Sequence, residues 1–205
     1  LVAAATLLDT KLDEPRRGIE LWRSIEKEFG PNDESGDALR SLLARVGEAK
    51  ELAEVLEREC ARAIDPARTS ALHAELGDVL RGSLGKHSAA LAEYEKSLEA
   101  APETLTAIRG LEALLTEPKT HDAAVDALTR ALKRSGDHAG FVELTAERVS
   151  VANTDSAKVT VYLEAAEVAE EKLNDRPRAF GLVGQAFLIA PSETVVEERL
   201  RGLAE

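Results

Sequence analysis

The stretch that decides the fold is "LGKHSAALAEYEKSLEAAP", residues 84–102. It starts with a glycine turn, continues with small and apolar residues at helical spacing, and stops at a proline. The same pattern returns 89 residues later as "LNDRPRAFGLVGQAFLIAP" (173–191) and, less closely, 72 residues earlier as "LDEPRRGIELWRSIEKEFGP" (12–31). Recurrence at such a spacing is typical of repeat proteins, so the stretch is one copy of a repeated unit.

The turns between the helical stretches repeat as well. Asp13, Gly85 and Asn174 occupy the same place in the three copies, and Gly47 and Gly136 form a second pair 89 residues apart. Asp, Gly and Asn all tolerate the left-handed backbone conformation that ends a helix. We therefore expect the same kind of helix-ending turn at each position.

Apolar residues recur at helical spacing through almost the whole chain. Residues 38–102 align with residues 127–191 without a gap, which places Leu56 opposite Thr145. We expect an α-solenoid of about twelve antiparallel helices joined by short turns. The expected helices span residues 1–11, 15–29, 35–46, 49–63, 66–83, 87–100, 103–116, 121–134, 138–152, 156–172, 176–189 and 192–205. The 89-residue spacing has room for one helix more than the 72-residue spacing, and the additional helix is either 103–116 or 121–134.

Several helix starts carry capping signals. Asp65 precedes Pro66, and Asp175 lies close to Pro177. A carboxylate can accept hydrogen bonds from the free amides of the first turn, and proline fits the first helical position. By the same reasoning Thr120 is a predicted N-cap.

The composition favours helices throughout. Apolar residues make up 44% of the chain but aromatic residues only 3%, and the abundant residue types are strong helix formers. We therefore predict an all-α protein with few strands. The chain begins with Leu1 and contains no Met, which favours a single helical array over residues 1–205 that is a segment of a longer polypeptide.

The charge balance argues against nucleic-acid binding. The chain has 26 basic and 38 acidic residues, a net charge of −12, and each half divided at Pro102 carries −6. Proteins that bind nucleic acids concentrate Lys and Arg on one face to contact phosphates. We expect no nucleic-acid partner.

Cysteine content and the N-terminal stretch bear on location. Cys60 is the only cysteine, which excludes an internal disulfide framework and fits a reducing compartment. The apolar stretch "LVAAATLL" (1–8) is too short to span a membrane and has no basic segment before it. We expect a cytoplasmic protein without membrane attachment, and leave open a targeting segment outside this sequence.

Residues 73–102 resemble a tetratricopeptide repeat, a helix-turn-helix unit of about 34 residues. The residues that carry the resemblance are Leu76, Gly77, Ala90, Tyr94, Ser97 and Pro102. The copy that ends at Pro191 keeps small residues at Ala179 and Ala186 but has Val183 in place of the aromatic residue, and the first copy has Trp22 there. The resemblance is good over residues 66–115 and 155–205 and loose elsewhere.

The resemblance implies a right-handed superhelix that acts as a non-catalytic scaffold and binds a protein or peptide on its concave surface. The residue types also have a physical explanation of their own. Small side chains at Ala90 and Ala179 let neighbouring helices approach closely, and a bulky side chain at Trp22 or Tyr94 fills the groove between them. Each repeat then packs against its sequence neighbours, so we expect a monomer.

No residue pattern points to catalysis. The four histidines, His73, His87, His121 and His138, are scattered without a second ligand at metal spacing, and Cys60 has no histidine partner in sequence. Phosphate-binding loops and nucleophile motifs are absent from the sequence. We therefore expect no catalytic residue, cofactor or metal site.

The one cluster that suggests a binding site is acidic. Glu164, Glu167 and Glu171 fall at i, i+3 and i+7 on one helix face, and Glu170 lies beside them. The matching helix 89 residues earlier carries Glu75 and Asp78. In the resembling family this face lines the concave groove, which implies a basic protein or peptide as the partner. The alternative interpretation is an ordinary solvated acidic face.

Two further hypotheses for the function stay open. The chain could be a helical regulatory or targeting arm of a larger enzyme or signalling protein whose catalytic domain lies outside this segment. A self-contained helical enzyme is the third possibility. The interaction scaffold is the leading hypothesis.

Overall fold

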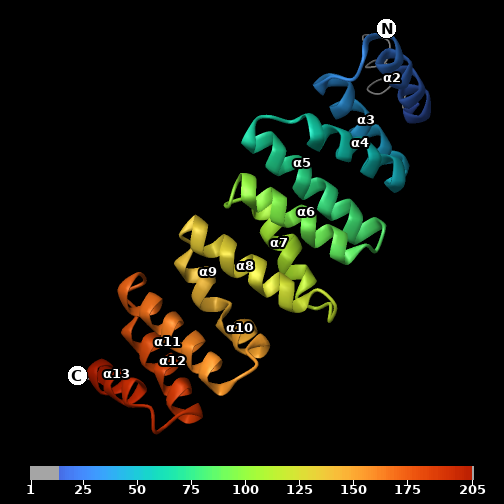
Figure 1. Cartoon of the computed structure of the whole chain (residues 1–205). Coiled ribbons are helices and arrows are strands. Elements are labelled where there is room, and N and C mark those ends of the chain that lie inside the picture. Colours follow the sequence, from blue (N-terminus) through green and yellow to red (C-terminus); the bar gives the residue numbers. More distant parts are fainter. Residues whose placement is uncertain (1–13, 205) are drawn as a thin grey trace. The chain divides into compact units, whose positions relative to one another are not determined.

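The computed structural model of the chain describes residues 14–204, and every regular element in this range is a helix (Figure 1). The chain divides into two compact units, residues 1–110 and residues 111–205. The all-α prediction is therefore confirmed for the described residues. The helix expected at residues 1–11 lies outside them, and the right-handed superhelix over the whole chain stays a prediction.

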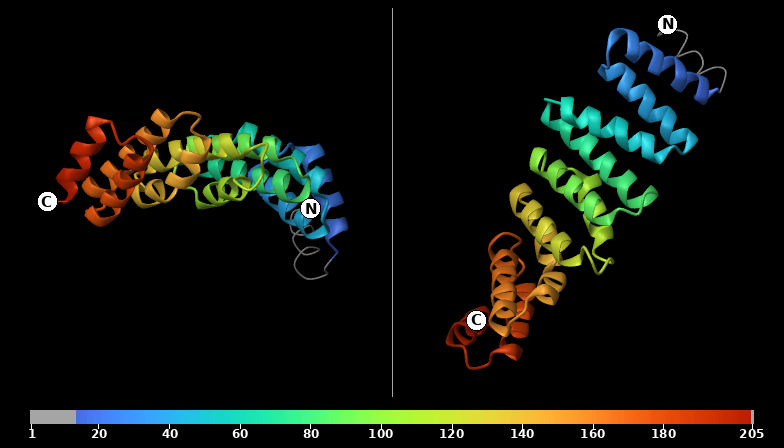
Figure 2. Two further views of the ribbon diagram at one scale, coloured as in Figure 1. Left: turned by 90° about the horizontal axis from the view of Figure 1, so that it is seen from below. Right: turned by 45° about the vertical axis from the view of Figure 1, so that its right-hand side comes forward.

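Unit 1 consists of helices that pack in sequence order. Its elements are α2 (Pro15–Phe29), α3 (Asp33–Val46), α4 (Ala49–Arg62), α5 (Pro66–Asp78), a π turn (Val79–Ser83), α6 (His87–Ala100) and the first part of α7 (Leu105–Leu114). Figure 2 shows α5 and α6 side by side as an antiparallel hairpin, and α2, α3 and α4 pack in the same sequential way. Each helix buries its apolar face against its sequence neighbours, as the repeat pattern predicts.

Unit 2 has the same kind of packing. It contains the end of α7 and the helices α8 (His121–Ser135), α9 (His138–Glu143), α10 (Thr145–Val151), α11 (Asp155–Glu171), α12 (Arg176–Ile189) and α13 (Thr194–Ala204). The hairpin α11–α12 is the counterpart of α5–α6, and α13 packs on α12. The buried face of α11 is built from small residues, Ala165, Ala166 and Ala169, which lets α12 approach closely.

The predicted helix-ending turns are present. Gly85 has φ +63° and Asn174 has φ +54°, while Gly47 and Gly136 have φ +76° and +72°. All four lie in the left-handed region, so the prediction from the aligned turns is confirmed for them. Asp13 lies outside the described residues.

The predicted N-caps are correct at two positions and wrong at one. The carboxylate of Asp65 accepts a hydrogen bond from the Arg68 amide at 2.8 Å, and that of Asp175 from the Arg178 amide at 3.0 Å. Thr120 has right-handed helical dihedrals instead of the extended ones of an N-cap. Its buried hydroxyl therefore donates backwards to the Leu114 carbonyl at 3.2 Å.

Two helices differ from the sequence prediction. The helix expected over 66–83 ends at Asp78 and continues as the π turn, in which the Leu84 amide donates to the Val79 carbonyl five residues back. The helix expected over 138–152 is divided at Leu144 into α9 and α10. There the buried Thr145 hydroxyl donates to the Val142 carbonyl at 2.6 Å and competes with the helical bonding pattern.

The core of the hairpin α5–α6 is centred on Tyr94. The side chain is fully buried, and its ring lies between two glycines, Gly77 on α5 and Gly110 on α7. The small residues Ala90 and Ser97, one turn to either side on α6, are also fully buried. The tetratricopeptide-like pattern of small residues around one large ring is thus present in space as well as in sequence.

Candidate functional site

The candidate site is a groove between α11 and α13, which we call the C-terminal groove. Its volume is about 650 Å³. The lining residues are Thr160, Leu163, Glu164, Glu167, Glu171, Val195, Glu198 and Arg199. Three of the six acidic residues predicted from the sequence therefore line one hollow, together with the apolar side chains of Leu163 and Val195. Val195 is 65% exposed, so its methyl groups are available for contact.

The local sequence explains why these side chains face the groove. The N-cap Thr154 accepts a hydrogen bond from the Ala157 amide at 3.1 Å and fixes the start of α11. From there the alanine face of α11 packs on α12, and the side chains at helical spacing on another face, Glu164, Glu167 and Glu171, are left outside this contact.

Glu164 is held by two basic side chains of neighbouring helices. Lys133 of α8 donates to it at 2.5 Å, and Arg148 of α10 donates to its other carboxylate oxygen. Partial burial acts to raise the pKa of Glu164, but the hydrogen bonds from Lys133 and Arg148 outweigh it and hold the pKa below its usual value. Glu164 is therefore ionised at neutral pH, with its charge partly neutralised.

An aromatic ring positions the two cations. The Arg148 guanidinium lies 4.2 Å from the centroid of the buried Phe141 ring, and the Lys133 ammonium lies 5.2 Å from it. Such cation–π contacts stabilise the cations where they meet Glu164. Glu164 therefore stabilises the packing of α8, α10 and α11 and also lines the groove.

The other acidic residues that the sequence predicts for the site in unit 2 differ in how available they are to a binding partner. Glu170 forms an ion pair with Arg199 of α13, with 2.7 Å between the carboxylate and the guanidinium, and this pair links α11 to α13. Glu167 and Glu171 are exposed, and within residues 14–204 neither has an ion-pair partner. With four glutamates and one arginine in its lining, the C-terminal groove carries an excess of negative charge.

The two predicted acids of unit 1 have structural contacts. Glu75 forms an ion pair with Arg40 of α3, and Asp78 accepts a hydrogen bond from the Tyr94 hydroxyl at 2.7 Å. Arg81 of the π turn donates to the same hydroxyl through Nε at 3.1 Å. These contacts hold α3, α5 and α6 together, so Glu75 and Asp78 are less available to a partner than Glu167 and Glu171.

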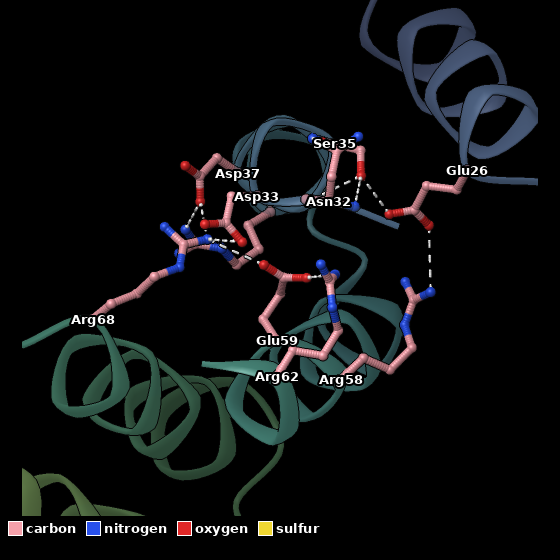
Figure 3. Close-up of polar contacts among 10 residues, drawn as sticks. Glu26, Asn32, Asp33, Ser35, Asp37, Arg58, Glu59, Arg62 and Arg68 are labelled. Carbon is pink, nitrogen blue, oxygen red and sulfur yellow. Dashed lines mark hydrogen bonds and ion pairs between the residues drawn. The ribbon is translucent and has the colours of Figure 1, made fainter. Parts of the chain in front are cut away.

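A buried ion-pair cluster in unit 1 was not predicted (Figure 3). Glu59 of α4 is only 4% exposed, and its carboxylate pairs with Arg62 at 2.9 Å and with Arg68 of α5 at 3.1 Å. Gly36 of α3 lies against this carboxylate, because a Cβ there would come within 2.5 Å of it. The available signal was the spacing, since Glu59 continues the apolar row of Leu52 and Val55 along α4.

The larger groove of unit 1 has a different character. It has a volume of about 840 Å³ and lies between α2 and α4, with Leu39 and Val55 among its lining residues. Ion pairs cross it from α2 to α4, between Arg23 and Glu51 and between Glu26 and Arg58. Its lining mixes three basic with four acidic residues, and so it favours one sign of ligand less than the C-terminal groove does.

Polar side chains that could serve catalysis or metal binding are engaged structurally. His73 is hydrogen-bonded to Glu93 at 2.7 Å, and His121 to Glu147 at 3.0 Å. Burial raises the pKa of the Cys60 thiol to about 11, so the thiol is protonated at neutral pH. In the described part of the chain no group of three His, Cys, Asp or Glu residues is placed to hold a metal ion. No described helix combines the length and apolar character needed to cross a membrane.

Comparisons with known proteins include likenesses to solved structures. No protein-family profile matches the sequence, and no curated protein matches it. The chain is similar to a tetratricopeptide repeat protein from Parabacteroides merdae, with a TM-score of 0.46 and 12% identity over 100% of this chain and 83% of that chain. It is also similar to the APC/C hetero-tetramer Cut9-Hcn1, with a TM-score of 0.35 and 14% identity over 98% of this chain and 45% of that chain.

Proposed function

We propose that the chain is a non-catalytic scaffold that binds a protein or peptide in the C-terminal groove. The observation that carries the proposal is the combination of two accessible apolar side chains, the half-buried Leu163 and the exposed Val195, with carboxylates at Glu167 and Glu171 that have no ion-pair partner within residues 14–204. Recognition sites of this kind use apolar contacts for affinity and charges for partner choice.

The charge of the groove favours a basic ligand. A hollow lined mainly by charges of one sign concentrates ligands of the other sign. We infer that the ligand is a peptide segment with Lys or Arg side chains next to an apolar residue. The basic side chains would meet Glu167 and Glu171, and the apolar residue would contact Leu163 and Val195.

The position of the groove fits the scaffold proposal. α11 is the first helix of the hairpin α11–α12, and α13 follows that hairpin and packs on α12. From the resemblance to tetratricopeptide repeats we infer that the side on which α11 and α13 lie is the concave surface. Glu75 and Asp78 lie on the equivalent helix of unit 1. We propose that they make weaker contacts with the partner, because their carboxylates are already bonded to Arg40 and Tyr94.

The test uses two synthetic peptides, one that alternates Lys with Leu and one with Glu in place of each Lys. The basic peptide is expected to bind the chain more tightly, and its affinity to fall as salt is added. The double variant Glu167→Gln and Glu171→Gln should weaken binding by about 3- to 10-fold, because each exposed charge pair contributes under about 1 kcal/mol.

The matched control is the double variant Glu20→Gln and Glu28→Gln, which removes two exposed carboxylates from α2 and leaves the groove intact. It should bind the basic peptide as the unmodified chain does. Equal loss of affinity in both variants would mean that only the net charge matters, and no loss in either would mean that the groove does not bind the peptide.

A further inference from the structure

Among the glutamates that line the C-terminal groove, Glu164 is already bound to basic side chains of the chain itself. The lining of the groove comes from α11 and α13, whereas Lys133 lies at the end of α8. Lys133 donates to Oε1 of Glu164 at 2.5 Å and so reaches this carboxylate from outside the groove. A basic side chain of the chain therefore occupies the kind of contact that the basic ligand would make.

Arg148, the second cation on Glu164, is fixed in place. Its side chain is only 8% exposed, and its guanidinium packs on the Phe141 ring. Its Nη1 is buried and finds no hydrogen-bond partner among residues 14–204, so its charge depends on Glu164 for compensation. Separating Arg148 from Glu164 would leave a buried charge without its partner, which is strongly destabilising.

Lys133, in contrast, is free to exchange. Its side chain is 51% exposed, and its ammonium lies farther from the Phe141 centroid, at 5.2 Å, than the guanidinium of Arg148 does, at 4.2 Å. An ammonium that leaves so exposed a contact is solvated by water, and exposed ion pairs contribute little to stability. Lys133 can therefore leave Glu164 with little loss of stability, whereas Arg148 cannot.

We propose that Oε1 of Glu164 is a cation-binding position of the C-terminal groove, which Lys133 occupies in the free chain until a Lys or Arg side chain of the ligand takes its place. The inference rests on the proposed function, because it requires a basic ligand in the groove. Arg148 stays on the other carboxylate oxygen and keeps Glu164 in position. Lys133 is then an internal competitor that lowers the affinity of the groove for basic ligands.

The local charges favour exchange over simple addition of a ligand cation. With Lys133 and Arg148 both bound, two positive charges surround the single carboxylate of Glu164, and they repel a third cation. Glu167 follows three residues later on the same face of α11, about 5 Å away, and has no ion-pair partner within residues 14–204. A ligand cation drawn to Glu167 thus arrives next to Glu164, and the departure of Lys133 gives it a second carboxylate.

The test measures the affinity of the 205-residue chain for the Lys-Leu peptide by titration calorimetry. Lys133→Gln removes the internal competitor and should tighten binding by about 2- to 5-fold, the factor that one exposed ion pair supplies. Lys133→Arg puts a cation back at the same place and should reverse this gain.

The matched control is Lys96→Gln on α6. Lys96 is 53% exposed and donates to Glu93 at 2.8 Å, so the variant breaks an equivalent ion pair away from the groove and changes the net charge by the same amount. It should leave the affinity almost unchanged. NMR follows the exchange itself, because the ε-methylene group of Lys133 lies near the Phe141 ring. Its signal should move towards that of a solvated lysine as the peptide is added, while the signal of Lys96 stays in place.

The outcomes separate this inference from the proposed function. A chain that does not bind the peptide at all would overturn both. Binding that the double variant Glu167→Gln and Glu171→Gln weakens, but that Lys133→Gln does not tighten, would overturn the exchange alone. Equal effects of Lys133→Gln and Lys96→Gln would do the same, as would a Lys133 signal that does not move when the peptide saturates the chain.

Discussion

The ring of Tyr94 lies directly against the backbone of Gly77, so closely that a Cβ at residue 77 would come within 2.5 Å of the ring carbon Cε1. The ring is fully buried and cannot move aside without disturbing the hairpin α5–α6. We predict that Gly77→Ala lowers the free energy of unfolding by about 1 to 3 kcal/mol through overpacking. Gly181→Ala, at an open and exposed position of α12, should instead raise it slightly. Urea denaturation of both variants measures the difference, and equal effects would mean that the ring does not fill this space.

A second prediction concerns the hydroxyl of Tyr94. Its hydrogen bonds with Asp78 and Arg81 join α6 to the end of α5 and to the π turn. Tyr94→Phe keeps the ring and should cost about 1 kcal/mol, because the part-buried hydrogen bond to Asp78 is lost. Burial and the neighbouring Asp78 raise the pKa of Tyr94 to about 12. In spectrophotometric titration, the ionisation that Tyr94→Phe removes should therefore lie above the ordinary tyrosine pKa of about 10. Loss of an ionisation at the ordinary value would contradict the assignment.

The buried carboxylate of Glu59 gives a third prediction. Glu59→Ala leaves Arg62 and Arg68 without their shared partner and opens a void next to Gly36. We expect a loss of about 2 to 4 kcal/mol, below the value for fully buried pairs because both arginines are partly exposed. Arg62→Ala leaves Glu59 paired with Arg68 and should cost less. Thermal unfolding of the two variants measures the difference. A thermal midpoint of Arg62→Ala that is as low as that of Glu59→Ala, or lower, would contradict the prediction.

The fourth prediction is a pH dependence in unit 2. Hydrogen bonding to Glu147 and then to Asp122 raises the pKa of His121 above its ordinary value. The folded chain thus holds this proton more tightly than the unfolded chain, so the stabilisation is fully present below the unfolded pKa of about 6.5 and is lost as the pH rises through the folded pKa. His121→Gln should therefore lower the melting temperature more at about pH 5.5 than at about pH 8.5. A difference that is equal at both values would show that the proton makes no contribution.

The helical repeat could be predicted from the sequence because its signals are local. Glycine and asparagine at Gly85 and Asn174 fix the turns through backbone conformation alone, and Ala90 and Tyr94 mark the buried face through size and spacing. The division at Leu144 could not be predicted in this way. It depends on the Thr145 hydroxyl, which a hydropathy pattern treats as just another residue of the helix.

The acidic site was predicted only in part for a related reason. Helical spacing places Glu164, Glu167 and Glu171 on one face, and the structure brings them to one groove. Spacing within a helix says nothing about partners on other helices, so the pairing of Glu164 with Lys133 and of Glu75 with Arg40 could not be foreseen. The buried cluster at Glu59 was missed because its arginine partner Arg68 lies on the next helix.

The central claim, that a basic peptide binds in the C-terminal groove, is tested most directly by the methyl NMR signals of the chain during titration with the Lys-Leu peptide. We predict that the signals of Leu163 and Val195 shift first and saturate together, while those of Leu39 and Val55 in the groove of unit 1 stay in place. Shifts at Leu39 and Val55 without any at Leu163 and Val195 would contradict the claim.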